Sequence, residues 1–347
     1  MMETELHDRV RASGMTWLVT GAAGFIGSNL VEALLRLDQC VIGLDNFSTG
    51  RTRNLDQIRE GVTSERWSRF RSVNGDIRDV EVCRELCADA DIVLHHAAVC
   101  SVPQSIADPS TTHACNVTGF LNMLMAARDC RVRRVVYATS CAVYGDGPEQ
   151  PKVEDRGVQP LSPYATSKYV NELYADLFGR CYGTESIGLR YFNVFGRRQD
   201  PEGAYAAVVP QWVAAMIRNE PVFINGDGET SRDFCHIDNV IQANLLAATT
   251  NNRDAINQVF NIGVGESITL NELYRLIRAE LCSRPASEHD LQPTYREFRV
   301  GDIRHSLADI SKARKLLGYQ PSRRLAQGLA EAMPWYLSNV DRSADVT

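Results

Sequence analysis

The chain has 347 residues, of which 44% are hydrophobic and 23% charged, and a formal net charge of −6. This length fits one large α/β domain or a large domain with a smaller lobe. The negative charge argues against a nucleic-acid partner, which would require a basic face. No apolar run approaches the roughly 20 residues of a membrane-spanning helix, and the first dozen residues lack the apolar core of a signal peptide. We therefore expect a cytoplasmic protein that binds neither nucleic acid nor membrane.

Ten cysteines are scattered along the sequence rather than grouped. Only Cys83 and Cys87 lie close together, and no second Cys or His pair at zinc-ligand spacing accompanies them. A chain of this length in a reducing compartment needs no disulfide framework. We expect most cysteines to be small packing residues and expect no metal site.

In its first half the chain alternates between short apolar runs and amphipathic segments such as 118–130. The short apolar runs, which predict strands, are residues 17–20, 41–44, 92–94, 134–137 and 186–189. Alternation of this kind predicts an α/β fold with a Rossmann-like, doubly wound parallel sheet and helices on both faces.

The alternation weakens after residue 196. Segments 208–219 and 270–281 predict helices, and short strands are expected near 222–224 and 259–262. We expect a smaller C-terminal, substrate-binding lobe over the strand ends of the main domain. The expected division is a cofactor-binding domain with the catalytic residues at 14–195, a lobe mainly at 196–338 that is interleaved with it, and a tail at 339–347.

A glycine-rich turn follows the first predicted strand. Gly21, Gly24 and Gly27 are spaced three and three, with Phe25 and Ile26 between the last two. This is not the commonest dinucleotide fingerprint, but glycines here still permit a tight turn and bring a pyrophosphate close to amides at a helix N-terminus. A purely structural turn is the alternative.

Asp45 ends the second predicted strand, where a carboxylate accepts hydrogen bonds from the adenosine ribose of a dinucleotide. Its negative charge would repel a 2′-phosphate, and Asn46 rather than an arginine follows it. These features predict NAD rather than NADP as cofactor. Asp76 and Ile77 are candidates to flank the adenine. Asp45 also has an ordinary interpretation as a solvated turn carboxylate.

Tyr164 and Lys168 are four residues apart and so share one face of a helix. A free tyrosine has a pKa near about 10, and a fixed neighbouring cation favours the phenolate and lowers that pKa. Ser140, at the end of an apolar run, would share the substrate proton. Such Tyr–Lys pairs are also common on helix surfaces. The glycine turn in the same chain favours a site that moves a proton and a hydride to or from an alcohol carbon.

Ser162 and Pro163 suit the start of the helix that carries Tyr164, because serine caps free amides and proline fits the first turn. Further along, Leu173, Leu177 and Cys181 repeat every four residues. We expect these three to mark the buried side of the helix and to leave Tyr164 facing a cleft.

The glycine turn together with Ser140, Tyr164 and Lys168 resembles the extended short-chain dehydrogenase/reductase superfamily. Segments 189–196, 225–234 and 299–302 resemble its NAD-dependent epimerase/dehydratase branch. From about residue 17 to 336 the chain is most similar to the UDP-N-acetylglucosamine 4-epimerases of bacterial surface-polysaccharide (O-antigen) synthesis, and nearly as similar to uronic-acid 4-epimerases.

This resemblance implies an isomerase with bound NAD that interconverts UDP-GlcNAc and UDP-GalNAc for polysaccharide precursor synthesis. The reaction would proceed by transient oxidation to a 4-keto sugar that turns over in the pocket. The resemblance also implies a homodimer.

The resemblance assigns residues to each ligand. Arg232 and Arg299 would hold the UDP diphosphate, Asp302 the uridine ribose, and Phe223 would stack on the uracil. Tyr191 and Val194 are implied to line the nicotinamide, and His96 is implied as a further cofactor contact. The other implied substrate contacts are Ser101, Ser140, Cys141, Tyr164, Asn193, Asn225 and Ser306.

Ser306 is implied to form part of the wall around the rotating sugar. Relatives specific for UDP-galactose and UDP-glucose place a tyrosine there, which crowds the C2 substituent, whereas a serine leaves room for an N-acetyl group. A small residue at a turn before Leu307 is the purely structural alternative.

The sequence also departs from its relatives. Cys141 and Ala142 stand where relatives carry serines, His96 where they carry glutamine, Cys100 where they carry glycine and Gln104 where they carry arginine. Because of these departures, the sequence does not decide which UDP-sugar is the substrate. UDP-N-acetylglucosaminuronic acid, UDP-glucose and UDP-glucuronate remain alternatives.

Other reaction classes fit less well. Dehydratases of this branch need an acid/base pair directly after the serine, and Cys141 and Ala142 do not supply one. A net reductase would share Ser140, Tyr164 and Lys168 and would differ in cofactor stoichiometry. A non-catalytic NAD or UDP-sugar sensor would have no need of a tyrosine base.

Overall fold

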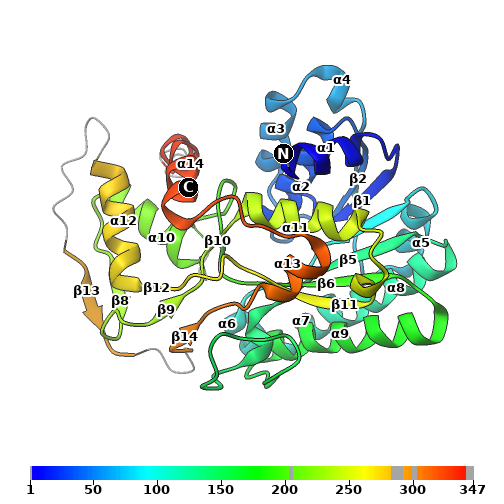
Figure 1. Ribbon diagram of the computed structural model, residues 1–347. Coiled ribbons are helices and arrows are strands. Elements are labelled where there is room, and N and C mark those ends of the chain that lie inside the picture. Colours follow the sequence, from blue (N-terminus) through cyan, green and yellow to red (C-terminus); the bar gives the residue numbers. More distant parts are fainter. Residues whose placement is uncertain (1, 203–205, 283–291, 299–302, 341–347) are drawn as a thin grey trace.

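The computed structural model describes residues 2–202, 206–282, 292–298 and 303–340 (Figure 1). Its main element is a seven-stranded sheet of order β11-β6-β5-β4-β1-β2-β3, in which every neighbouring pair is parallel. The strands are β1 (Thr16–Thr20), β2 (Cys40–Asp45), β3 (Phe70–Asn74), β4 (Ile92–His95), β5 (Arg134–Ser140), β6 (Ser186–Tyr191) and β11 (Gln258–Ile262). The prediction of a doubly wound, Rossmann-like parallel sheet is confirmed.

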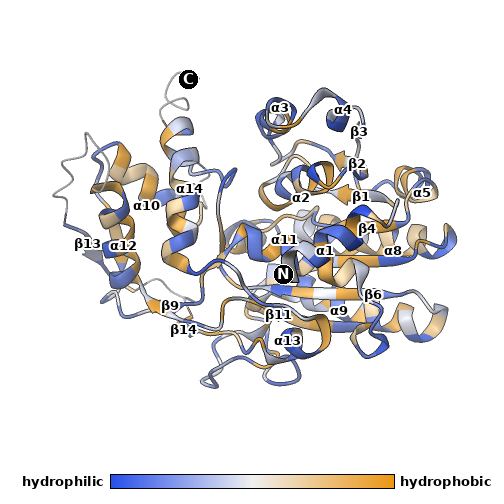
Figure 2. Cartoon of the chain, turned by 45° about the horizontal axis from the view of Figure 1, so that its top comes forward, coloured by the Kyte–Doolittle hydropathy of each residue, from blue (hydrophilic) through white to orange (hydrophobic). Residues whose placement is uncertain are grey.

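Helices cover both faces of the sheet. One layer contains α1 (Met2–Arg11), α2 (Phe25–Arg36), α3 (Thr52–Gly61), α11 (Ile237–Thr249) and α13 (Ser311–Leu317). The other layer contains α5 (Val80–Ala88), α8 (Gly119–Asp129) and α9 (Pro163–Tyr182). Since both faces are covered, β1 and β2 consist of almost continuously buried residues, and both strands are hydrophobic in Figure 2.

Short helical segments connect these layers. They are α4 (Ser64–Trp67), α6 (Val102–Ala107), α7 (Pro109–His113), a π-helical turn (Ala114–Thr118) and two 3₁₀ turns (Cys141–Tyr144 and Arg253–Ala255). None of the helices in the described ranges is long and apolar enough to cross a membrane.

A second, smaller lobe lies beside the sheet (Figure 1). Its helices α10 (Val208–Ile217), α12 (Leu270–Cys282) and α14 (Leu325–Asn339) share a separate apolar core that includes Trp212, Leu273 and Met333. Its strands are β8 (Phe223–Asn225) with β13 (Thr294–Arg296), and β9 (Ser231–Arg232) with β12 (Ile268–Thr269) and β14 (His305–Ser306). β7 (Val194–Phe195) pairs with β10 (Cys235–His236).

The chain passes between sheet and lobe more than once. After β10 it returns through α11 to β11, which pairs with β6 at the edge of the main sheet. The strand expected near residues 259–262 therefore belongs to the main sheet, and only part of the chain after residue 196 builds the lobe.

Helix α9 begins as the sequence predicts. The Ser162 hydroxyl oxygen accepts a hydrogen bond from the Ala165 amide at 3.2 Å, and Pro163 occupies the first turn. Gly183, at φ 69°, ends the helix in the left-handed conformation. The boundaries of the helix that carries Tyr164 are thus set by ordinary capping chemistry.

The predicted buried side of α9 was wrong. Leu173 and Leu177 are 51% and 41% exposed, and Cys181 is also exposed. The side that faces the sheet instead carries polar groups, including Lys168 and Glu172. A repeat of apolar residues marks an apolar face but does not say which neighbour covers it.

Candidate active site

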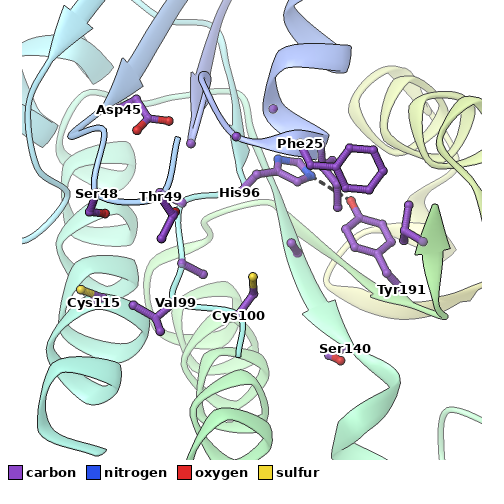
Figure 3. Close-up of a pocket in the computed structure, with 18 of the residues that line it drawn as sticks. Phe25, Asp45, Ser48, Thr49, His96, Val99, Cys100, Cys115, Ser140 and Tyr191 are labelled. Atoms are coloured by element: carbon purple, nitrogen blue, oxygen red, sulfur yellow. Dashed lines mark hydrogen bonds between the residues drawn. The ribbon is translucent and has the colours of Figure 1, made fainter. Parts of the chain in front are cut away.

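A cavity of about 600 Å³ opens at the carboxyl ends of the strands, between β1 and β4 where the strand order reverses. Ligands of open α/β sheets bind at this switch point. All the predicted cofactor residues line the cavity: Gly21, Gly24, Phe25, Ile26, Gly27, Asp45, Asn46, Asp76, Ile77, His96, Tyr164, Lys168, Tyr191 and Val194. Figure 3 shows several of them converging from different strands.

The glycine turn forms a cradle that side chains would fill. Gly21 has φ 71°, and a Cβ added to it would lie 2.9 Å from the Ala97 amide nitrogen. A Cβ on Gly27 would lie 2.0 Å from the Gly21 carbonyl oxygen. The turn ends at Gly24, the N-cap of α2, which has no side-chain cap. Backbone amides at the N-terminus of α2 therefore suit the pyrophosphate of a dinucleotide.

Asp45 is held rigidly at the end of β2. Its carboxylate accepts hydrogen bonds from the Ala23 and Phe47 amides, both at 2.8 Å, and the residue is only 9% exposed. It is therefore not a solvated turn carboxylate. Asn46 donates to Asp76 at 2.8 Å, and the Arg78 guanidinium pairs with Asp76 at 2.7 Å. Hydrogen bonding from Arg78 holds the pKa of the Asp76 carboxyl well below its ordinary value.

The three predicted catalytic residues come together in this cavity. Tyr164 lies in the first turn of α9 and Lys168 one turn later, while Ser140 ends β5. The Lys168 ammonium donates to the Ala138 carbonyl oxygen at 2.9 Å, and the Ser140 hydroxyl accepts from the Ala142 amide at 3.2 Å. The adjacent ends of β5 and α9 thus position one hydroxyl, one phenol and one ammonium.

The electrostatics differ from the expectation for Tyr164. Burial raises the pKa of the Tyr164 phenol above its ordinary value, and hydrogen bonding with Ser140 acts in the opposite direction. Burial also lowers the pKa of Lys168 to about 8. The prediction that the Lys168 ammonium lowers the pKa of Tyr164 was therefore wrong for the protein without its ligands. Removal of the phenol from water raises this pKa by more than the neighbouring groups lower it. The phenol is therefore protonated at neutral pH unless a bound ligand adds positive charge.

The sequence analysis missed Asn116, which lies in the π-helical turn and is 1% exposed. Its side chain accepts from the Val99 amide at 2.8 Å and donates to the Val99 carbonyl at 2.9 Å and to the Ser167 hydroxyl at 3.0 Å. These bonds join α9 to the loop after β4, which lines the cavity. An asparagine with no pattern around it gives no sequence signal, whereas a π-helical turn frequently marks a functional site.

Thr20 was also missed. Its hydroxyl oxygen accepts hydrogen bonds from the His96 and Ala97 amides, both at 3.1 Å. It therefore fixes the loop after β4 against the end of β1, directly above the glycine turn.

The predicted substrate residues fall into three groups. Ser140, Cys141, Tyr164 and Asn193 line the main cavity. Ser306 and Arg232 are register partners in β14 and β9, and both lie near Cys141, which lines the cavity. Burial raises the pKa of the Cys141 thiol, so it is neutral near neutral pH.

The third group lies apart from the main cavity. Phe223 and Asn225, on β8, line a separate cavity of about 370 Å³, and the Arg296 guanidinium lies 3.2 Å from the Phe223 ring centroid. Ser101 belongs to neither cavity lining but lies between Cys100 and Val102, which line the main cavity, and it caps α6 by accepting from the Gln104 amide at 3.1 Å. Arg299 and Asp302 lie outside the described residues, so their role stays a prediction.

Comparison with known proteins decides the family. Residues 17–263 match the model of the NAD dependent epimerase/dehydratase family. The chain belongs to this family. The prediction of NAD as cofactor is thereby confirmed, and the cradle at Gly21 and Gly27 with the carboxylate of Asp45 fits that cofactor.

Similar proteins include three with different sugar substrates. A putative UDP-glucose 4-epimerase of Methanocaldococcus jannaschii is 37% identical and covers 93% of this chain and 98% of its own. The UDP-N-acetylglucosamine 4-epimerase of Methanobrevibacter ruminantium, solved with UDP-N-acetylmuramic acid, is 36% identical over the same shares, with a TM-score of 0.85. The UDP-glucuronic acid 4-epimerase of Bacillus cereus, solved with UDP-glucuronic acid and NAD, is 30% identical, covers 93% and 99%, and has a TM-score of 0.81.

Proposed function

We propose that this protein is an NAD-dependent UDP-sugar 4-epimerase that interconverts UDP-GlcNAc and UDP-GalNAc for polysaccharide precursor synthesis. This proposal rests on the observation that Ser140, Tyr164 and Lys168 line the same cavity as the glycine turn and Asp45. Similar proteins named as 4-epimerases of UDP-sugars support the reaction class.

The chain supplies the proton chemistry. NAD, when bound, supplies a hydride acceptor and then a hydride donor for C4 of the sugar. The Tyr164 phenolate takes the proton of the sugar 4-hydroxyl, and the Ser140 hydroxyl hydrogen-bonds to the same oxygen. Lys168 is charged below its pKa of about 8, and its ammonium together with the positive charge of bound NAD⁺ would offset the burial that otherwise keeps the Tyr164 phenol protonated. The same phenol returns the proton once the 4-keto sugar presents its other face.

The residues after Ser140 argue against elimination of water. Burial raises the pKa of the Cys141 thiol, so the thiol is neutral near neutral pH, and Ala142 carries only a methyl group. Neither residue can act as an acid/base pair on the sugar. This supports epimerisation over dehydration.

Ser306 supports the acetamido sugars. It is 7% exposed and lies against Cys141, so a tyrosine in its place would project into the space around the sugar. We expect Ser306→Tyr to abolish turnover of UDP-GlcNAc and UDP-GalNAc while sparing some turnover of UDP-glucose and UDP-galactose. Ser306→Ala is the matched control, which should keep the acetamido activity. A Ser306→Tyr variant that handles acetamido sugars like the parent would show that Ser306 does not select the substrate.

The deciding experiment is a panel of UDP-sugars incubated with purified protein without added NAD, followed by chromatographic identification of the products. We expect UDP-GlcNAc and UDP-GalNAc to be interconverted best and the protein to carry its own NAD. Faster conversion of UDP-glucuronate or UDP-N-acetylglucosaminuronic acid would assign the uronic acids instead. Stoichiometric accumulation of NADH would indicate a dehydrogenase.

A second copy of the chain is the proposed partner of the outer face of α9. Leu173 and Leu177 are 51% and 41% exposed and lie one turn apart on the same side of this helix. α8 packs beside α9 and adds the partly buried Leu121 and Met125. Two neighbouring helices with apolar outer faces suit a two-fold interface in which the same patch meets itself. The ten cysteines, which are all unpaired, agree with the cytoplasmic location proposed for the reaction.

A further inference from the structure

His96 makes a contact that no part of the proposed chemistry uses. It follows β4, and its imidazole Nε2 lies 2.9 Å from the Tyr191 hydroxyl oxygen at the end of β6 (Figure 3). The two rings are stacked, with centroids 6.0 Å apart and planes inclined by 15°. Both residues line the cofactor cavity.

The hydrogen-bond directions around Tyr191 define the state of the imidazole. The Asn244 side-chain amide donates to the Tyr191 hydroxyl oxygen at 2.9 Å. The hydroxyl keeps its own proton, which it can donate to Nε2 of His96 in the tautomer that carries the imidazole proton on Nδ1. Burial lowers the pKa of His96 to about 3, and the charge of Lys168 acts in the same direction. The imidazole is thus a neutral acceptor at working pH.

The pair lies at the catalytic end of the cavity. Tyr191 is the register partner of Ser140 in β6 and β5. The His96–Tyr191 bond therefore spans the end of β5 and connects the strands on either side of it. Because Asp45 marks the ribose of the adenosine half and Tyr164 the reacting carbon, the nicotinamide half has to lie beside this pair.

We infer that His96 is a positioning residue for the cofactor: its bond to Tyr191 holds that ring as a rigid wall of the nicotinamide half of the cavity and slows release of NAD. The inference rests on NAD binding and not on the identity of the sugar. A 4-epimerase needs such retention, since a cofactor that leaves after the first hydride transfer would strand the 4-keto sugar.

Three variants and one double variant test this inference. His96→Leu removes the acceptor, Tyr191→Phe removes the donor but keeps the ring, and His96→Gln restores an acceptor on a shorter side chain. We expect His96→Leu and Tyr191→Phe each to release NAD roughly three- to tenfold faster than the parent, the size of one hydrogen bond. His96→Gln should recover most of the loss, and the double variant His96→Leu with Tyr191→Phe should be no worse than either alone.

The readout is the rate at which NAD leaves the purified protein after dilution into a nucleotide-scavenging buffer, measured without any UDP-sugar. His7→Leu, a histidine change in α1 outside the cavity, is the matched control and should release NAD like the parent. Parent-like release from Tyr191→Phe, or additive effects in the double variant, would overturn the inference. Tyr191→Phe keeps the ring packing, so its rate of NAD release tests the role of the hydrogen bond even if His96→Leu does not fold. A failed UDP-sugar assay with slow NAD release would count against the proposed function alone.

Discussion

The two faces of α9 contrast sharply. The inner face is polar yet buried: it carries Lys168 and Glu172, which are 3% and 6% exposed. The outer face exposes two leucines, Leu173 and Leu177, beside the exposed ion pair of Asp176 and Arg180. A helix in which the charged side is inside and the leucine side is outside reverses the usual amphipathic arrangement.

The buried charges of the inner face and the exposed leucines of the outer face have different explanations. On the inner face, Glu172 pairs with Arg190 of β6 at 2.6 Å and accepts from the Thr139 hydroxyl at 2.7 Å, so its charge is fully compensated. Arg190 also donates to the Glu154 carbonyl at 2.9 Å. On the outer face, the leucines would pack against the second copy of the chain proposed above. The comparison suggests that α9 serves the active site on one side and assembly on the other, and four predictions test this.

The largest effect is expected at Tyr164. Tyr164→Phe keeps the ring but removes the proton acceptor, and loss of a general base costs roughly 10²–10⁴-fold in rate. NAD content and UDP-sugar affinity should remain close to those of the parent. The measurements are steady-state epimerisation and nucleotide released from denatured protein.

Tyr182→Phe is the matched control on the same helix, because its side chain is 55% exposed at the far end of α9. It should retain turnover. Near-normal turnover of Tyr164→Phe would remove this phenol from the mechanism.

The buried ion pair should dominate the stability of α9. Glu172→Gln leaves Arg190 without its counter-charge, and breaking a buried pair from one side costs about 3–5 kcal/mol in free energy of unfolding. Asp176→Asn tests the outer face, where Asp176 and Arg180 pair at 2.7 Å but are 54% and 70% exposed. An exposed pair contributes about 0–1 kcal/mol.

Denaturant unfolding of both variants, followed by circular dichroism, gives the comparison directly. Equal losses of free energy of unfolding in the two variants would mean that burial does not make the Glu172–Arg190 pair more stabilising than an exposed pair.

The outer face is tested through assembly. Leu173→Lys combined with Leu177→Lys places two unpaired charges in the proposed interface, which should weaken self-association by at least about 100-fold. Light scattering after gel filtration should then report a monomer where the parent is a dimer. Tyr295→Lys, at a residue of the lobe that is 52% exposed, is the control and should leave the mass unchanged. A parent of monomeric mass would rule out the proposed dimer.

The parts of the site that the sequence predicts are those built from short-range geometry. Gly21 and Gly27 act through the local shape of one turn, and Tyr164 with Lys168 through the repeat of one helix. Asp45 was placed by its position at the end of a strand. Each of these signals needs only a few neighbouring residues.

The remaining features depend on contacts between distant segments. Asn116 bonds Val99 and Ser167, and neither partner is visible in a local pattern. Glu172 pairs with Arg190 of the neighbouring strand β6, whereas Leu173 faces away from the sheet and is exposed. The raised pKa of Tyr164 follows from its burial, which spacing alone does not give. Hydrophobic periodicity and local spacing do not show which distant segments will hydrogen-bond, form ion pairs or bury one another.

The smallest expected effect concerns the cap that starts α9. Ser162→Ala removes the acceptor for the Ala165 amide, and loss of an N-cap typically costs about 0.5–2 kcal/mol. Because Tyr164 lies in the first turn, fraying there should also lower turnover, although far less than removal of the phenol. Thr63→Ala, at the N-cap of the short α4, removes a comparable bond to the Arg66 amide at 3.3 Å outside the cavity. Thr63→Ala should lower the free energy of unfolding without changing turnover. Ser162→Asn, which keeps a capping side chain, should retain both the stability and the turnover of the parent. If Ser162→Ala lowers the free energy of unfolding but turnover per folded molecule equals that of the parent, the position of the phenol is fixed by Ser140 and the surrounding packing and not by the helix cap.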